Sequence, residues 1–315
     1  MAAVTVPLPK SKASKRTRHE TILFYTCIAP FILGILFFDL IPMGASLVLS
    51  FTQWDILTPP KFIGLQNYIK AFTQDPNFPI ILKVTFKYAL VAVPLRLASG
   101  LLLAILLNEA TRGVGFFRTA FYLPAIVSSV AAAVLWTWIL NPVYGPVNGL
   151  LALFHINGPQ WFTDPKFALW GLIMMAPWGV GGEMLIFLAG LKGIDKQLYE
   201  AAELDGAGRL SKFFKITLPM LSPALFFNLV MSVIGALQSF DTAYVISTAR
   251  AGTLGGPLKS TLFYMIYLYN RAFAGSEMGY ASALGWILFA IIMVLTLLVL
   301  RSSSLWVFYE AERKH

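Results

Sequence analysis

Charged side chains are scarce in this sequence. Lys, Arg, Asp and Glu together make up 12% of its 315 residues, about half the share found in typical soluble domains. Apolar residues make up 57%, and the mean hydropathy is +0.71. This composition excludes a soluble fold with a charged surface and a disordered chain, and it predicts a polytopic membrane protein.

Cysteine and histidine are also rare. The single cysteine, Cys27, lies inside the first apolar run, and the three histidines are far apart. A disulfide framework and a Cys- or His-based metal site are therefore excluded. The sequence has no G-x-x-x-x-G-K-[ST] loop, no G-x-S-x-G and no H-E-x-x-H. We predict a non-catalytic chain without a metal site and without a bound nucleotide cofactor.

Six apolar segments are long enough to span a bilayer, for which about 20 residues of helix suffice. They cover residues 22–50, 84–107, 118–140, 168–190, 222–247 and 279–300. The expected fold is therefore an all-α membrane protein. A six-helix transmembrane domain over residues 22–300 lies between an N-terminal tail (1–21) and a C-terminal tail (301–315).

The net charge of +9 is distributed as in a membrane protein and not as in a nucleic-acid-binding protein. With the N-terminus inside, the inner regions hold fifteen basic residues and the outer regions eight, and Arg96 lies in mid-membrane. Because inner loops carry an excess of Lys and Arg, we expect both termini in the cytoplasm, with membrane lipid around the helices. The aromatic stretch 258–273 is expected to form an interfacial helix at the outer surface.

The inner loop 191–221 has helix-forming residues interrupted by glycine. Asp195 is a candidate N-cap for a helix up to Leu204,. Gly206 and Gly208 end that helix, and a second short helix follows from Arg209 to Ile216, stopped by Pro219 and Pro223. From spacing alone, this loop is either interfacial structure or a docking element for a partner.

The same loop carries a specific motif. The run Glu200-Ala201-Ala202-Glu203-Leu204-Asp205-Gly206-Ala207, followed by Leu218-Pro219, resembles the EAA signature of ABC-importer permease subunits. Phe62-Ile63-Gly64-Leu65-Gln66-Asn67-Tyr68 and Gly279-Tyr280-Ala281-Ser282-Ala283 extend the similarity to sugar-importer permeases of the maltose type, over nearly the whole chain.

The resemblance implies the type I ABC importer permease fold with a cytoplasmic coupling helix, in a prokaryotic inner membrane. It implies as partners a second homologous permease subunit, two ATPase subunits that bind ATP and Mg²⁺, and an extracytoplasmic solute-binding protein that delivers a carbohydrate. The expected ATPase-coupling residues are Tyr199, Glu200, Ala201, Ala202, Leu204, Asp205 and Gly206.

Substrate contacts in the family come from the span before the EAA loop and the span after it. Carried over by position, they are Trp178, Gly179, Gly182, Glu183, Ser232, Gln238, Ser239 and Asp241. Each also has a structural interpretation: a core tryptophan, close helix packing at the glycines, or interhelical hydrogen bonds.

Charges within spans are costly and need a reason. Arg96 could pair with Asp39 or Glu183, or these groups could line a wet pathway. We expect a neutral di- or oligosaccharide as the substrate. A glycerol-phosphate permease would favour Arg or Lys in the pathway, and a secondary transporter would need internal repeats.

Overall fold

The computed structural model describes residues 15–109, 112–251 and 254–308; the rest of the predicted tails, 1–14 and 309–315, lies outside them. The described chain is almost entirely helical. Its α-helices are α1 (Lys15–Gly34), α2 (Ile41–Ser50), α3 (Gln66–Ile69), α4 (Phe78–Glu109), α5 (Val114–Ile126), α6 (Ser129–Ile139), α7 (Pro146–Leu153), α8 (Ala168–Met175), α9 (Gly181–Lys192), α10 (Lys196–Leu204), α11 (Arg209–Lys212), α12 (Leu218–Met220), α13 (Ser222–Leu237), α14 (Asp241–Ala251), α15 (Tyr264–Tyr269) and α16 (Met278–Trp306).

Short π- and 3-10 turns connect several of these helices. They are η1 (Ile35–Leu40), η2 (Lys70–Gln74), η3 (Ala176–Gly179), η4 (Phe213–Thr217), η5 (Pro257–Lys259) and η6 (Asn270–Ala274). Two short strands, β1 (Thr52–Gln53) and β2 (Lys61–Phe62), pair antiparallel with Thr52 opposite Phe62.

The described chain has six candidate membrane spans when each bent helix pair is counted once. Four are single helical segments: His19–Ser50, Phe78–Glu109, Ser222–Thr248 and Met278–Trp306. Two are bent pairs, Val114–Ile126 with Ser129–Ile139 at 101° and Ala168–Gly179 with Gly181–Lys192 at 44°. The predicted all-α, six-span organisation is confirmed, but two spans are broken.

The third span departs most from its prediction as one continuous helix over 118–140. Val127 and Ser128 adopt extended backbone, with ψ of 135° and 137°, so α5 and α6 meet at a sharp angle. Pro124, three residues earlier, cannot donate a backbone hydrogen bond. The end of the loop 191–221 also differs from the prediction. Pro219 and Pro223 do not stop a helix but occupy the first turns of α12 and α13, where proline fits well.

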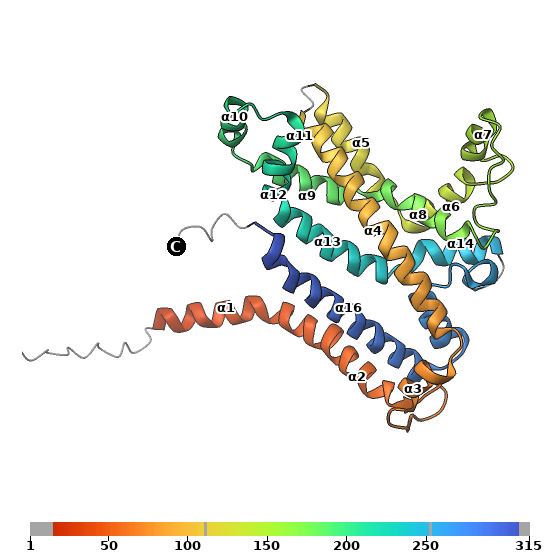
Figure 1. The fold of residues 1–315 in the computed structure, drawn as a ribbon. Coiled ribbons are helices and arrows are strands. Elements are labelled where there is room, and N and C mark those ends of the chain that lie inside the picture. Colours follow the sequence, from red (N-terminus) through yellow and green to blue (C-terminus); the bar gives the residue numbers. More distant parts are fainter. Residues whose placement is uncertain (1–14, 110–111, 252–253, 309–315) are drawn as a thin grey trace, which may run out of the picture.

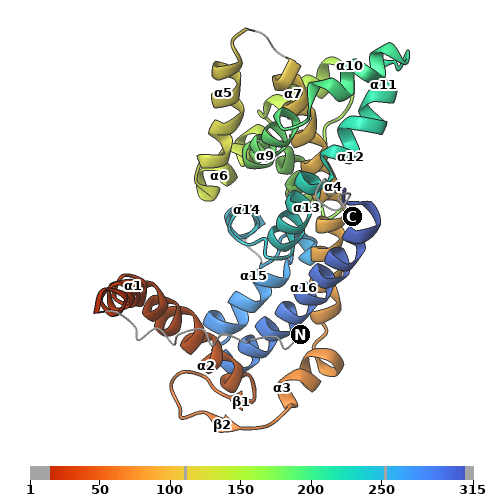
Figure 2. The same ribbon diagram turned by 90° about the vertical axis from the view of Figure 1, so that its left-hand side faces the viewer.

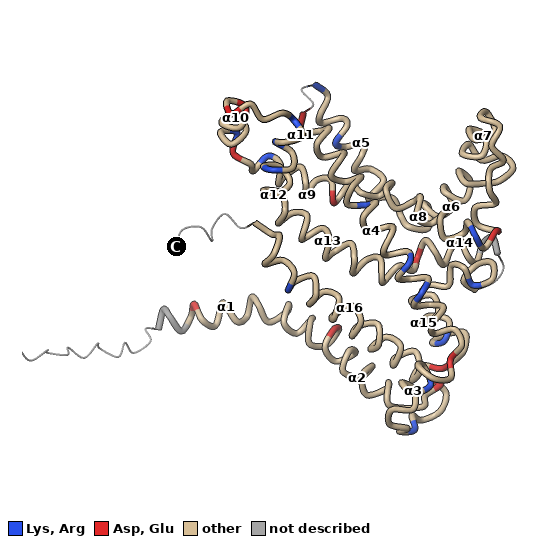
Figure 3. The backbone as a smooth tube through the Cα atoms, viewed as in Figure 1, with Lys and Arg blue, Asp and Glu red and all other residues tan. Residues whose placement is uncertain are grey.

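The long helices α4, α9 and α13 pack against one another, and α2 packs against α16 (Figure 1). Trp286 of α16 donates a hydrogen bond to Ser46 of α2 over 3.1 Å. Helix α1 extends away from the others (Figures 1 and 2). None of the 18 residues in the most apolar stretch of its span, His19–Ser50, is buried inside the protein. The start of α1, the end of α16 and helix α10 share one side of the molecule, opposite α3 and α7. Figure 3 shows that charged residues gather at the helix ends.

The aromatic stretch 258–273 does not form the predicted interfacial helix. Phe263, Tyr264 and Tyr267 are buried in the larger hydrophobic core. Tyr264 donates its backbone N–H to Thr85 Oγ1 (2.9 Å) and its hydroxyl to the carbonyl oxygen of Leu284 (2.7 Å). Because these partners satisfy the polar groups internally, α15 can be buried between α4 and α16.

Candidate functional site

Two adjoining cavities border both α4 and α14; α5, α6 and α8 complete the first, and α9 and α13 complete the second. The first, here called the Trp178 cavity, has a volume of about 210 Å³ and is lined by Trp178, Gly179 and apolar residues of α8. The second, the Ser232 cavity, has a volume of about 470 Å³ and is lined by Gly182, Glu183 and Ser232. Both cavities share the lining residues Tyr88, Arg96, Ser239 and Thr242.

An ion pair lies where the cavities adjoin. The guanidinium of Arg96 donates from Nε (3.0 Å) and Nη2 (2.5 Å) to Oε1 of Glu183, and Nη2 also lies 3.4 Å from the carbonyl oxygen of Gly179. Of the two partners considered for Arg96 from the sequence, the structure selects Glu183 and not Asp39. The pair connects α4 to the start of α9, where the acidic side chain in the first helical turn is also favoured by the helix dipole.

Six of the eight predicted substrate-pathway residues line these cavities. They are Trp178, Gly179, Gly182, Glu183, Ser232 and Ser239. Gln238 and Asp241 are exposed and lie outside the lining of both cavities. Ser129 donates a hydrogen bond to Asp241 over 3.2 Å, so Asp241 connects α6 to α14. A role of Gln238 and Asp241 in transport stays a prediction.

Two hydroxyl residues of the lining, Tyr88 and Thr242, are not among the residues predicted from the sequence. Tyr88 lies eight residues before Arg96 on α4, a spacing that places both side chains on one helix face. The mid-span charge of Arg96 was therefore the signal that could have identified Tyr88. Thr242 follows Asp241 at the break between α13 and α14, and only the fold brings it to the cavities.

The glycines around the cavities divide into two groups. A Cβ atom at Gly179, Gly182 or Gly235 would meet open space, whereas one at Gly181 would lie 2.8 Å from the Cα of Tyr122. Gly181 is thus needed for the contact between α9 and α5. Gly179 and Gly182, with Gly235 of α13, are not needed for packing within this chain, and they keep the cavities wide.

Buried Ser232 has an unpaired hydroxyl. Its Oγ is buried and has no hydrogen-bond partner among the described residues. A buried polar group without a partner is uncommon in proteins and calls for an explanation, such as a ligand. Because Ser232 lines the cavity that carries its name, a polar group bound there could complete its hydrogen bonding.

The loop 191–221 forms the predicted helix, α10. Asp195 caps it by accepting a hydrogen bond from the backbone N–H of Gln197 (2.9 Å). Gly206 follows α10 with φ of +78°, a conformation that favours glycine. The side chains of Leu198 and Leu204 are exposed, Leu204 to 90%, and Glu200 is exposed beside them.

Tyr199 is oriented differently from its neighbours on α10. Its hydroxyl lies 2.9 Å from Oγ1 of Thr217, and its ring packs against the smaller hydrophobic core around Leu191. It therefore ties α10 to the membrane helices. Lys212 of α11 forms an ion pair with Glu203, which holds the two short helices of the loop together.

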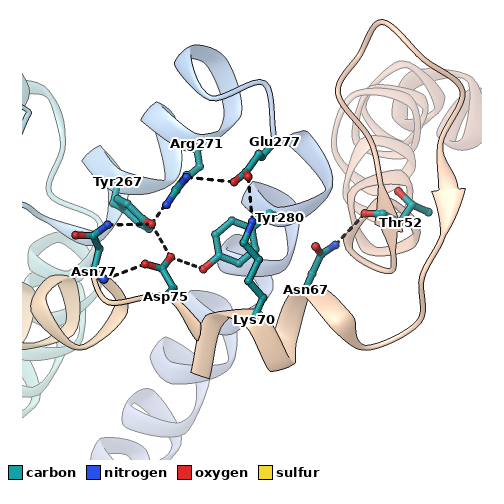
Figure 4. Close-up of polar contacts among 9 residues, drawn as sticks. All are labelled: Thr52, Asn67, Lys70, Asp75, Asn77, Tyr267, Arg271, Glu277 and Tyr280. Atoms are coloured by element: carbon teal, nitrogen blue, oxygen red, sulfur yellow. Dashed lines mark hydrogen bonds and ion pairs between the residues drawn. The ribbon is translucent and has the colours of Figure 1, made fainter. Parts of the chain in front are cut away.

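A polar network joins the segment after α3 to the segment that connects α15 and α16 (Figure 4). Asp75 is buried, and its Oδ2 accepts hydrogen bonds from the hydroxyls of Tyr267 (2.5 Å) and Tyr280 (2.6 Å). Burial raises the pKa of Asp75, but these hydrogen bonds and the charge of Arg271 outweigh it and hold that pKa below its ordinary value,. Nothing in the sequence marked this network.

Around this carboxylate, Glu277 accepts hydrogen bonds from Lys70 (3.0 Å) and Arg271 (3.4 Å). The ammonium group of Lys70 also lies 4.3 Å from the ring centre of Tyr280. The network therefore fixes α16 to the segment that precedes α4.

Comparison with known proteins identifies the family. Residues 96–308 match the family described as binding-protein-dependent transport system inner membrane component. The chain is 48% identical over 305 residues to the "Probable ABC transporter permease protein YesP" of Bacillus subtilis (strain 168), covering 96% of this chain and 97% of the relative. It is 32% identical over 306 residues to the arabinooligosaccharides transport system permease protein AraP of the same organism, covering 94% and 95%.

A solved structure shares the fold. A subunit of a bacterial ABC transporter that imports the acidic polysaccharide alginate superposes with a TM-score of 0.79 at 24% identity, covering 92% of this chain and 97% of that one. Together with the six spans and the EAA loop, these similarities confirm the resemblance found in the sequence. The chain belongs to the binding-protein-dependent inner membrane components, and it is an ABC transporter permease with the type I importer fold.

Proposed function

We propose that this chain forms half of the translocation pathway of an ATP-driven carbohydrate importer, with a di- or oligosaccharide as substrate. A second, homologous permease subunit completes the pathway. Two ATPase subunits bind ATP and Mg²⁺ and drive transport, and an extracytoplasmic solute-binding protein delivers the sugar. The relative AraP supports the class of substrate, since its name assigns it to arabinooligosaccharides.

The observation that carries the proposal is the pair of adjoining cavities between the membrane spans. Trp178 can stack against the apolar face of a sugar ring, and Ser232, Ser239 and Thr242 can exchange hydrogen bonds with its hydroxyls,. Such a combination of an aromatic surface with a few convergent polar groups is typical of small-molecule sites.

The loop around α10 is the proposed contact with the ATPase. Exposed Leu198 and Leu204 and small Ala201 offer an apolar helix face that fits a groove on a partner protein,. Exposed Glu200 adds a charge for an ionic contact. In this proposal α10, and with it both chain termini, lies on the cytoplasmic side of a prokaryotic inner membrane.

The test is ATP-dependent sugar uptake into proteoliposomes that contain the complete transporter. Gly182→Leu and Gly235→Leu each place a side chain in the Ser232 cavity, so we expect uptake to fall at least tenfold while the complex still assembles. Gly44→Leu is the matched control, because Gly44 is a helical glycine with open space at its Cβ that lines neither cavity. Unchanged uptake in both cavity variants would contradict the proposal.

A further inference from the structure

The Arg96–Glu183 ion pair presents its two charges unequally to the cavities. The side chain of Arg96 is 31% exposed and that of Glu183 is 14% exposed. Arg96 lines both cavities, whereas Glu183 lines only the Ser232 cavity. Of the described residues that line the Trp178 cavity, Arg96 is the only charged one. A ligand in that cavity therefore meets a guanidinium and no carboxylate.

Part of the Arg96 guanidinium remains available for a ligand. A guanidinium has five N–H donors, and those of Nε and Nη2 are directed at Glu183 and at the carbonyl oxygen of Gly179. Among the described residues, none accepts a hydrogen bond from Nη1. The two N–H groups of Nη1 can therefore donate charge-assisted hydrogen bonds to a ligand carboxylate.

The other acidic side chain of this region does not compete for Nη1. Asp241 is exposed, accepts a hydrogen bond from Ser129 and does not line the Trp178 cavity. Glu183 accepts hydrogen bonds from Nε and Nη2 only, and it fixes the plane of the guanidinium between α4 and α9. The same cavity contains Trp178, which can contact a sugar ring.

We infer that the Trp178 cavity binds an acidic sugar unit, whose carboxylate accepts hydrogen bonds from Nη1 of Arg96 while Trp178 contacts its ring. This inference rests on the proposed carbohydrate transport and makes its substrate class specific. It differs from the neutral substrate expected from the sequence, because a sequence cannot show that the cation of the pair is the more exposed partner.

The experiment uses the complete transporter in proteoliposomes, with its solute-binding protein. Uptake is measured for a panel of oligosaccharides of uronic acid units and for the same oligosaccharides with each carboxyl group reduced to an alcohol. We expect the wild type to import acidic members in preference to their reduced counterparts. The double variant Arg96→Gln with Glu183→Gln removes both charges together and should lower the ratio of acidic to reduced uptake at least tenfold.

Lys87→Gln is the matched control. It also removes one positive charge from α4, but Lys87 lies against the ring of Trp170 (5.6 Å) and lines neither cavity, so its ratio should stay at the wild-type value. Preference of the wild type for the reduced sugars, or an equal ratio in the double variant and the wild type, would overturn the inference and leave carbohydrate import intact. No ATP-dependent uptake of any member of the panel would instead overturn the proposed function.

Discussion

Removing the carboxylate of Glu183 tests the ion pair that connects α4 to α9. In Glu183→Gln the guanidinium of Arg96 keeps a neutral acceptor in place of the carboxylate, but its charge stays within the membrane without a counter-charge. Arg96→Gln leaves the carboxylate in the same position. Each single variant should therefore assemble less well than the double variant Arg96→Gln with Glu183→Gln, in which no charge remains.

The structure sets the size of this effect. Breaking a fully buried ion pair costs about 3–5 kcal/mol, but the Arg96 side chain is 31% exposed to the cavities, and water there reduces the cost. We expect a loss of about 1–2 kcal/mol for each single variant and a coupling energy of about 2–3 kcal/mol between them, at the upper end of the range for contacting residues. The Lys70–Glu277 pair, with side chains 37% and 35% exposed, is the control, and Glu277→Gln should cost less than about 1 kcal/mol.

The assay is a double-mutant cycle on the assembled complex. Detergent-solubilised transporter is heated in steps, and the fraction that remains assembled is measured by size-exclusion chromatography. Recovery of assembly in the double variant relative to either single variant shows the coupling. If the losses of the two single variants simply add in the double variant, Arg96 and Glu183 do not stabilise one another, and the account of this pair is wrong.

Three further predictions concern regions away from the cavities. Glu200→Lys and Gly206→Pro should abolish uptake and weaken association with the ATPase while the chain stays in the membrane. The first reverses the charge of an exposed side chain of α10, and the second distorts the turn after α10, because Gly206 has φ of +78°, which proline cannot adopt. Normal transport by either variant would refute the coupling role of α10. A reporter fused after His315 should be cytoplasmic and one within residues 143–160 should be outside, and the opposite pattern would reverse the proposed orientation. Asp75→Asn should lower the melting temperature at pH 7. Because folding holds the pKa of Asp75 below its ordinary value, this difference should be full above about pH 5 and shrink as the pH falls below about 4; a difference independent of pH would contradict it.

Hydropathy was sufficient to locate the spans. In lipid, a single segment can satisfy its own backbone hydrogen bonds only as a helix, so a long apolar run predicts a helical span. Hydropathy could not show the 101° bend of the third span, because Val127 and Ser128 are ordinary residues that no rule marks as extended. The aromatic composition of residues 258–273 also led to a wrong prediction, because it indicated an interfacial helix where Tyr264 is buried. An aromatic residue with a hydroxyl fits a membrane interface and a buried site equally well, and the choice depends on whether Leu284 supplies an acceptor.

The glycines show most clearly where sequence reasoning ends. Gly181 and Gly182 are adjacent and belong to the same Gly-rich stretch, so a pattern assigns them one role. On a helix, neighbouring residues point about 100° apart, so one Cα faces Tyr122 of α5 and the other faces the Ser232 cavity. Alanine at Gly181 would therefore force α5 and α9 apart, whereas alanine at Gly182 would only narrow the cavity. Which glycine serves packing and which serves the pathway depends on the helix rotation, and that rotation is set by contacts such as the pairing of Arg96 with Glu183 between residues 87 positions apart.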